Sequence, residues 1–585
     1  MTEQSKDVPT VAQRSTEADW VSHLADEVIT EAEGRRLGKP VVVASGLSPS
    51  GPIHLGNLRE VMIPHLVADE LRRRDVGCVH ILSWDDYDRF RKVPVGADPS
   101  WSQHIGKPLT SVPAPAGSPY PNWAEHFKAP MVEALARLGV EYQGISQTEQ
   151  YTSGAYREQI LLAMRERERI DAVLGRYRTK AKPGAAARKQ GSIGELEAAA
   201  AEAAAEGSGA ASEDDGGTTR GYFPYKPYCS ACERDLTTVT AYDDITTALA
   251  YTCACGHAET VRLAEHHRGK LVWKVDWPMR WAYEGVLFEP SGVDHQSPGS
   301  SFVIGGKLVE EVFGGQQPIG PMYAFVGISG MAKMSSSKGG VPTPTDALQI
   351  MEEPLLRWLY VRRKPQQSFT IAFDQEIQRL YDEWDALERR VADGTASAAD
   401  ANSHDRAVRT AARELPRTPR PLPYRTLASV ADITTGNQEQ TLRILSDLDP
   451  DHPLGSLDEL RPRLDRAQTW VDTQLPADQR TRLREQPDTQ MLSSLSDPER
   501  RSLDLLLAGL DAHWSLDGLS SLVYAVPKLQ AGLAADAKPT PELKAAQRSF
   551  FARVYWLLIG RDTGPRLPTL LLAAGPSQVR KLLSS

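Results

Sequence analysis

Hydrophobic positions follow two different patterns along the chain, and the change lies near residue 343. In the first part, a β-branched apolar run at residues 41–44 predicts a buried strand, and apolar residues at helical spacing over 58–66 predict a helix after it. Another apolar run at residues 77–83 completes a strand–helix–strand unit, which predicts a parallel sheet. Pro64 should kink the connecting helix or limit its first turns, because proline cannot donate a backbone hydrogen bond. We therefore expect an α/β fold for this part.

Beyond residue 343 the apolar positions repeat with helical spacing, as at residues 353–360 and 377–391. Residues 183–219 instead contain an alanine- and glutamate-rich run and a flank of glycine, serine and aspartate, which cannot build a packed core. We expect this stretch to be a mobile insertion. The expected divisions of the chain are a disordered N-terminus (1–18), the first half of a parallel-sheet domain (19–182), the insertion (183–219), a zinc ribbon (220–268), the second half of the sheet domain (269–342), a helical connecting domain (343–415) and a helical C-terminal domain (416–585).

The first strand leads into the turn Pro49-Ser50-Gly51-Pro52-Ile53-His54-Leu55-Gly56-Asn57. A helix that begins near His54 would present free N–H groups and the positive end of its dipole, which together form an anion site. The glycines let a nucleotide approach the backbone closely, and His54 adds a neutral or cationic donor where a phosphate would sit. The spacing is neither that of a Walker loop nor that of a dinucleotide fingerprint. The alternative is an ordinary strand–helix turn.

A second loop, Lys333-Met334-Ser335-Ser336-Ser337-Lys338, lies between glycines far downstream. Lysines supply point charges to phosphates, and serines supply short hydrogen bonds. The composition therefore suits a mobile loop that closes on a triphosphate. The alternative is a solvated, flexible loop without a ligand.

Four of the five cysteines are clustered as Cys229-x-x-Cys232 and Cys253-x-Cys255. This arrangement is close to that of paired zinc knuckles, and an odd, clustered set of cysteines favours a metal over disulfides. The second pair is one residue short of the usual spacing, so His257 is an alternative fourth ligand. We expect a structural zinc site, because four protein ligands leave no open position for chemistry. The alternative is a group of free thiols.

Bulk properties exclude some classes of protein. The 585 residues are 41% hydrophobic and 24% charged with a net charge of −9, as in globular proteins of several domains. No run approaches the roughly 20 apolar residues of a membrane span. The first 16 residues have no apolar core for a signal peptide, so the cytoplasm is the default expectation. The negative charge counts mildly against a nucleic-acid partner but does not exclude a local basic surface.

The first loop resembles the HIGH motif of class I aminoacyl-tRNA synthetases, with Asn57 at its final position, and the second resembles their KMSKS loop. With Asp276-Trp277-Pro278-Met279-Arg280-Trp281, the cysteine cluster and the helical second half, they resemble class I lysyl-tRNA synthetases over about residues 20–400. The resemblance implies a Rossmann-type catalytic domain and a helical anticodon-binding domain. It also implies activation of L-lysine by ATP with Mg²⁺, transfer to the 3′ end of tRNA(Lys), and a structural Zn²⁺.

The resemblance further implies roles for individual residues. The expected catalytic residues are His54, Asn57, Lys333 and Lys338. The expected ATP-binding residues are Pro49, Ser50, Gly51, His54, Gly56, Asn57, Met334, Ser335, Ser336, Ser337 and Lys338. The expected lysine pocket consists of Gly46, Ser48, Trp273 and His295, with an acidic partner such as Asp85 or Asp294.

The ε-ammonium of lysine needs a carboxylate, because an unpaired charge in a desolvated site costs several kcal/mol. The sequence does not choose among the candidates, which are Asp85, Asp86, Asp276, Glu284 and Asp294. The turn with three aspartates between residues 85 and 88 could also hold Mg²⁺ or be solvated. Trp273 would contact the aliphatic stem of lysine, or it could belong to a buried helix stripe of tryptophans spaced by four, against which Pro278 argues.

Three other functions stay open at this point: another class I synthetase such as a glutamyl or arginyl enzyme, a small nucleotidyltransferase of the same superfamily, and an inactive RNA-binding paralogue. The helical part after residue 343 is longer than a nucleotidyltransferase needs. The sequence does not tell a principal enzyme from a duplicate, and it does not give anticodon contacts or the oligomeric state.

Overall fold

The computed structural model describes residues 19–93, 98–178, 217–218, 221–296, 299–329, 340–448, 451–538 and 540–584. The predicted disordered N-terminus and residues 183–216 of the predicted insertion lie outside the described residues. The chain forms two compact units, each with its own internal contacts. Unit 1 comprises Met1–Leu348, Glu353–Ile371 and Arg390–Leu415, and unit 2 comprises Gln349–Glu352, Ala372–Arg389 and Pro416–Ser585.

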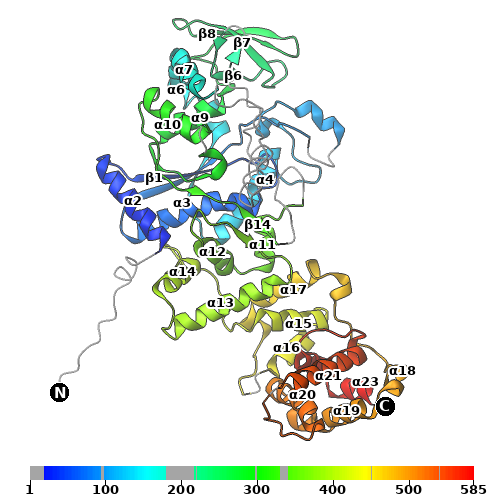
Figure 1. The fold of residues 1–585 in the computed structure, drawn as a ribbon. Helices are drawn as coiled ribbons and strands as arrows, with labels where there is room; N and C mark the ends of the chain where they lie inside the picture. The colour runs from blue at the N-terminus through cyan, green and yellow to red at the C-terminus, as the bar shows by residue number, and fades with distance from the viewer. Residues whose placement is uncertain are drawn as a thin grey trace, which may run out of the picture. The chain divides into compact units, whose positions relative to one another are not determined.

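Unit 1 is built on a four-stranded sheet in which neighbouring strands are parallel (Figure 1). The strands are β1 (Val41–Leu47), β2 (Cys78–Trp84), β3 (Gln143–Ser146) and β11 (Val286–Phe288), and their order is β11-β1-β2-β3. The predicted parallel sheet is thus confirmed. Because the strand order reverses at β1, the carboxyl ends of β1 and β11 flank the position where such sheets bind ligands.

Helices cover both faces of this sheet. They are α2 (Trp20–Gly34) and α3 (Leu55–Arg73) on one face, and α9 (Trp273–Glu284) and α10 (Ser301–Glu311) on the other. Val41 and Val43 of β1 pack with α2 and α3, whereas Ala44 packs with α9 and α10, because successive strand residues point to opposite faces. α3 continues through Pro64, so the expectation that Pro64 limits its first turns is wrong. The residues around Pro64 are buried, and that packing outweighs one missing backbone hydrogen bond.

An antiparallel sheet of order β7-β8-β9 and the pair β6–β10 lie between α7 and α9 in the chain. The other elements of unit 1 are α4 (Trp123–Arg137), α5 (Gln147–Thr152), α6 (Arg157–Arg165), α7 (Arg167–Arg178), β4 (Gly217–Thr218), β5 (Gly221–Tyr222), β6 (Tyr225–Pro227), β7 (Thr237–Tyr242), β8 (Ala248–Cys253), β9 (Ala258–Arg262), β10 (Gly269–Leu271), β12 (Ser291–Gly292), β13 (Met322–Tyr323), β14 (Val326–Ile328), α12 (Glu353–Val361), β15 (Phe369–Ile371) and α14 (Ala398–Val408). α11 (Pro344–Ile350) extends from unit 1 into unit 2.

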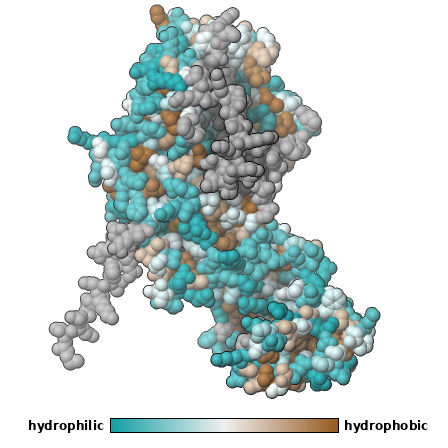
Figure 2. Space-filling view, in the orientation of Figure 1, coloured by the Kyte–Doolittle hydropathy of each residue, from teal (hydrophilic) through white to brown (hydrophobic). Residues whose placement is uncertain are grey.

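Unit 2 is helical, as the spacing of its apolar residues predicts. Its helices are most of α13 (Glu376–Ala392), α15 (Tyr424–Thr434), α16 (Gln438–Ser446), α17 (Arg463–Thr473), α18 (Thr489–Ser494), α19 (Asp497–Gly509), α20 (Leu516–Gln530), α21 (Pro541–Ile559), α22 (Leu567–Ala574) and α23 (Pro576–Leu583). Leucine and valine side chains of α19 to α23 form one hydrophobic core. Figure 2 shows hydrophilic and hydrophobic residues interspersed on the face in view. Within the described ranges, no helix is long and apolar enough to cross a membrane.

Candidate active site and metal centre

The loop that resembles the HIGH motif, residues 49–57, connects β1 to α3 and carries the cap of that helix. α3 begins at Leu55, and His54 is its N-cap residue, as the sequence predicts. The His54 Nδ1 atom accepts a hydrogen bond from the Gly56 N–H at 3.1 Å. In return, the Asn57 Oδ1 atom accepts one from the His54 N–H at 3.2 Å. These reciprocal bonds fix both polar side chains of the motif at the positive end of α3.

The same bonds determine which form His54 takes. Because Nδ1 accepts from Gly56, the ring proton of the neutral imidazole is on Nε2, which can donate to a ligand. Burial lowers the pKa of His54 to about 4. His54 is therefore a neutral hydrogen-bond donor at pH 7 and not the cationic donor that the sequence also allowed.

Further contacts hold the loop and the start of α3. The Trp123 indole donates to the Ser50 carbonyl at 3.1 Å, and the Tyr360 hydroxyl donates to the Leu55 carbonyl at 2.7 Å. The Leu55 N–H donates to the Pro342 carbonyl at 3.2 Å, so the chain just after the KMSKS-like loop contacts the first residue of α3. The residues predicted in that loop, Lys333, Met334, Ser335, Ser336, Ser337 and Lys338, lie outside the described residues.

A partly open cavity lies at the carboxyl edge of the sheet, beside β1. Its lining includes Gly46, Asp85, Trp273 and His295, which are four of the six residues predicted for the lysine pocket. Ser48 is exposed and is not among the lining residues. Asp294 is not among them either, although its Oδ2 atom lies 3.7 Å from Nε2 of His295. The other lining residues are Ala44, Glu60, Ile81, Ser83, Trp277, Arg280, Trp281, Glu284, Val286, Glu289, Pro290, Ser291, Gly292 and Tyr323.

Three tryptophans of α9 line this cavity. The rings of Trp273 and Trp277 stack with centroids 5.2 Å apart, and Trp277 and Trp281 are 5.0 Å apart. The expectation that Pro278 argues against a helix stripe is wrong, since α9 includes this proline in its second turn. The stripe and the cavity wall are one feature here, because the helix side that covers the sheet continues beyond the strand ends.

Two glutamates in the cavity were missed in the sequence. Burial raises the pKa of Glu60 to about 8, with contributions from the charges of Glu289, Asp85 and Asp294. Burial also raises the pKa of Glu289 to about 7, although its carboxylate accepts hydrogen bonds from two indoles. Among the described residues, neither glutamate forms an ion pair with a lysine or arginine. An acidic residue inside the apolar stretch 58–68 was the available signal for Glu60.

The aspartates of the turn after β2 are paired within the protein. Arg280 Nη1 lies 2.8 Å from Asp85 Oδ1, and Lys270 forms an ion pair with Asp88. Arg280 and Lys270 both also pair with Asp276 of α9, which is fully buried. The alternative of a solvated acidic turn is therefore wrong for Asp85 and Asp88.

Asp86 is buried as well and has a structural role. Its carboxylate accepts from the Ser146 hydroxyl and the Thr148 N–H, both at 2.7 Å, at the junction of β3 and α5. These two bonds connect the end of β2 to the neighbouring strand. The acceptor atoms of Asp86 therefore already serve backbone and hydroxyl donors within the protein.

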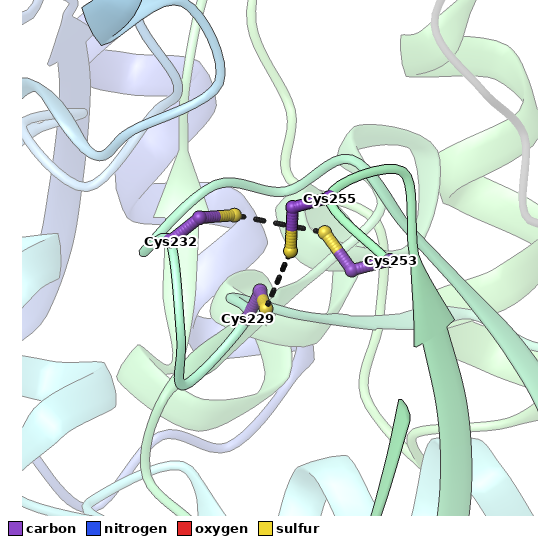
Figure 3. Close-up of side chains that lie close together, drawn as sticks. All are labelled: Cys229, Cys232, Cys253 and Cys255. Atoms are coloured by element: carbon purple, nitrogen blue, oxygen red, sulfur yellow. Dashed lines mark hydrogen bonds between the residues drawn. The ribbon is translucent and has the colours of Figure 1, made fainter. Parts of the chain in front are cut away.

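The four clustered cysteines point toward one another in the ribbon between β6 and β9 (Figure 3). Their sulfurs all lie within 4.8 Å of one another, with 3.8 Å from Cys229 to Cys255 and 3.6 Å from Cys232 to Cys253. Sulfurs that each bind one zinc at about 2.3 Å stand roughly 3.8 Å apart in a tetrahedron, so the geometry fits zinc.

His257, the alternative fourth ligand, does not belong to this group. Its Nε2 atom lies 3.0 Å from the Ser230 hydroxyl and 3.4 Å from a carboxylate oxygen of Glu259. The tight turn at Gly256, where φ is +89°, lets Cys255 turn its sulfur toward the other three despite the short spacing.

Comparison with known proteins agrees with these features. Residues 18–414, which include the sheet, the HIGH-like loop, the cavity and the cysteine cluster, match the family model described as tRNA synthetases class I (K). The chain belongs to this family.

Individual relatives match over nearly their whole length. The chain is 69% identical to the lysine–tRNA ligase of Streptomyces coelicolor over 585 residues, which covers 98% of this chain and 100% of the relative. It is 32% identical to the lysine–tRNA ligase of Thermococcus kodakarensis, with 96% of this chain and 99% of the relative covered. It is 31% identical to that of Treponema pallidum, with 97% and 98% covered.

Proposed function

We propose that this protein is a lysine–tRNA ligase. In the first step, the carboxylate of L-lysine attacks the α-phosphorus of ATP, which forms lysyl-adenylate and releases pyrophosphate. In the second step, the 3′-terminal ribose of tRNA(Lys) attacks the activated carbonyl and AMP leaves. The observation that carries the proposal is the cavity at the carboxyl end of β1, which borders the HIGH-like loop and contains carboxylates without a cationic partner among the described residues.

The cavity suits a cationic amino acid with an aliphatic stem. Burying a carboxylate without a partner costs several kcal/mol, and an ammonium brought in by the ligand removes that cost. Glu60 offers such a carboxylate, and Trp273 offers an apolar face that contacts both a methylene chain and a cation. An anionic substrate such as glutamate would instead raise the electrostatic cost of this site. The lysine-binding roles of Gly46 and His295 belong to the same proposal.

ATP would bind at the start of α3. The Nε2–H of His54 is a neutral donor at the positive end of the helix dipole, and it can follow the phosphate oxygens through in-line displacement without a change of charge. Asn57 keeps its amide NH₂ for a ligand, because its oxygen caps the helix. Lys333 and Lys338 would add positive charge from the KMSKS-like loop, and Mg²⁺ would neutralise the phosphates.

The cysteine cluster would hold one zinc, with Cys229, Cys232, Cys253 and Cys255 as ligands. Four thiolates leave no open coordination position, so the metal would stabilise the ribbon and take no part in the reaction. Metal analysis of the purified protein should find about one equivalent of zinc. Replacing Cys232 with alanine should remove it and destabilise the ribbon.

The partner tRNA would contact both units, with the helical unit 2 reading the anticodon. The domain divisions expected from the sequence belong to this proposal, as does a cytoplasmic location, where ATP, lysine and tRNA meet. Neither statement affects the chemistry proposed above.

The test is ATP–pyrophosphate exchange with each amino acid in turn, with and without tRNA. Lysine should drive exchange. Lys338→Ala should slow it by raising the activation barrier by about 3 kcal/mol, the usual effect of removing one preorganised charge-stabilising group. Exchange driven by glutamate or arginine would instead indicate another specificity. The absence of exchange with every amino acid would indicate an inactive RNA-binding protein.

A further inference from the structure

One wall of the cavity contains two indole N–H groups that donate to the same carboxylate, one to each of its oxygens. The Trp277 Nε1–H donates to Glu289 Oε1 at 3.1 Å, and the Trp281 Nε1–H donates to Glu289 Oε2 at 2.5 Å. All three side chains are buried, with 7%, 2% and 8% exposure for Trp277, Trp281 and Glu289. Each carboxylate oxygen therefore fixes the rotation of one ring, since a buried indole N–H without a partner is costly.

The orientation of Trp277 matters because this ring contacts both aromatic residues proposed to bind lysine. Trp273 stacks on Trp277 with the ring planes 19° apart. His295 meets the same indole edge to face, at 5.5 Å and 72°. A rotation of Trp277 about its side-chain bonds would therefore displace the surfaces of Trp273 and His295 together.

Glu289 itself is held by its backbone at the end of β11. Its N–H donates to the Ile319 carbonyl at 2.9 Å. Gly320 packs so closely that a Cβ atom at that position would lie 2.5 Å from the Glu289 carbonyl oxygen. The carboxylate thus starts from a fixed backbone position, and its rotation is limited by the two indoles that it binds.

We propose that Glu289 is a positioning residue for lysine recognition: it holds Trp277 and Trp281 by their indole N–H groups and thereby sets the positions of Trp273 and His295. This inference rests on the proposed function, because it assumes that lysine occupies the cavity. Glu289 acts through the indoles and not by direct contact with lysine. The shape of the cavity therefore depends on the Glu289 carboxylate, although the surfaces that would contact lysine belong to the rings of Trp273 and His295.

The test is a double-mutant cycle on Glu289 and Trp277, read as KM for lysine, KM for ATP and kcat in the exchange reaction. In Glu289→Gln, the amide NH₂ faces one of the two indole N–H groups, donor against donor. KM for lysine should rise about tenfold, while KM for ATP and kcat change less than about twofold, because the lost contact shapes only the lysine site. Trp277→Phe should raise KM for lysine by a similar factor, because it keeps a ring but removes the anchoring N–H.

The double variant distinguishes positioning from direct contact. With Trp277→Phe already present, the single amide oxygen of Glu289→Gln satisfies the one remaining indole, that of Trp281. Adding Glu289→Gln should then change KM for lysine by less than about twofold, which is a strongly non-additive result. Glu284→Gln serves as a comparison, since it removes a carboxylate from the same cavity lining that accepts no hydrogen bond from an indole of the described residues, and it measures the purely electrostatic part.

Additive effects of the two substitutions would overturn the proposal, because they would mean that Glu289 acts on lysine by itself. An unchanged KM for lysine in Glu289→Gln, with normal exchange in the parent, would overturn it without affecting the proposed function. Lack of lysine-dependent exchange in the parent would overturn both. If Glu289→Gln does not fold, Trp277→Phe alone decides: an unchanged KM for lysine contradicts the anchoring role.

Discussion

Two groups of buried carboxylates lie side by side at the carboxyl edge of the sheet, and they differ in what neutralises them. In the first group, burial raises the pKa of Asp276, but the charges of Arg280 and Lys270 and its hydrogen bonds outweigh this effect, so the pKa is lowered. In the second group, burial raises the pKa of Glu60 to about 8 and that of Glu289 to about 7. Asp85, also in the first group, keeps a raised pKa because burial outweighs the charge of Arg280. The first group is still complete in ion pairs with Arg280 and Lys270, whereas the second is incomplete, with no ion pair among the described residues.

The difference separates architecture from binding capacity. An ion pair completed inside the protein connects elements and leaves no charge for a ligand, as Arg280 does between α9 and the turn after β2. A buried carboxylate without a cation stores an unfavourable energy that a cationic ligand can relieve. Lysine specificity under our proposal therefore comes from the incomplete group. The complete group stabilises the elements around it.

The largest expected effect comes from breaking the complete group. Arg280→Met leaves the carboxylates of Asp85 and Asp276 buried without the guanidinium, which should cost about 3–5 kcal/mol of unfolding free energy. Urea unfolding measures it. Arg167→Met is the matched control, because its partner Asp244 is exposed, and it should cost less than about 1 kcal/mol. Equal losses in the two variants would contradict the distinction drawn here.

Removing a charge from the incomplete group should have the opposite signature. Glu60→Gln should reduce kcat/KM for lysine by a factor that corresponds to about 3 kcal/mol, because the ammonium loses a desolvated partner. The unfolding free energy should change little at pH 7, where the raised pKa keeps most of Glu60 protonated, and it should rise relative to the parent above pH 8, where the parent buries an ionised carboxylate. Exchange kinetics and urea unfolding on the same preparation test both parts. A large loss of stability with an unchanged KM for lysine would mean that Glu60 is structural.

The raised pKa values predict how lysine binding depends on pH. Only ionised carboxylates attract the ammonium, so KM for lysine should fall as pH rises toward 8, by up to about tenfold per unit or 1.4 kcal/mol. Lysine binding should release protons, which calorimetry in two buffers detects.

The stability of the fold should also depend on pH. Since the pKa of Glu60 in the folded protein lies above its unfolded value of about 4.3, the contribution of this group to the free energy of unfolding declines as pH rises from about 4.3 through about 8. A KM for lysine that is constant from pH 6 to 8 would refute the predicted pH dependence of lysine binding.

The smallest effect is expected at Tyr323. Its hydroxyl makes a hydrogen bond to Glu60 that lowers the glutamate's pKa, against the larger effect of burial. Tyr323→Phe should therefore raise the pKa of Glu60 further and weaken lysine binding at pH 7 by about 1 kcal/mol. The difference from the parent should shrink at pH 9, where Glu60 is ionised in both. A loss that is independent of pH would indicate that Tyr323 contacts lysine by other means.

Some features followed from local sequence because their physics is local. The β-branched run before the HIGH-like loop, the N-cap at His54 and the apolar spacing of the helices depend on neighbours within a few residues. The cysteine pairs predicted their cluster for the same reason, since two short turns bring each pair together. Pro278 misled the prediction because a local rule on helix breaking was applied where burial against the sheet decides.

The parallel-sheet fold, the loop that begins α3, the cysteine cluster and the helical second half could all be read from the sequence, because each is specified by short-range spacing of residue types. Which acidic residues are free to meet a cation depends instead on how distant segments pack together. Asp85, Asp276, Glu60 and Glu289 come from four separate segments, and the sequence gives no sign that Arg280 and Lys270 pair with the first two. Pairing of buried charges depends on distances between segments far apart in the chain, and those distances exist only after the sheet and its helices have packed.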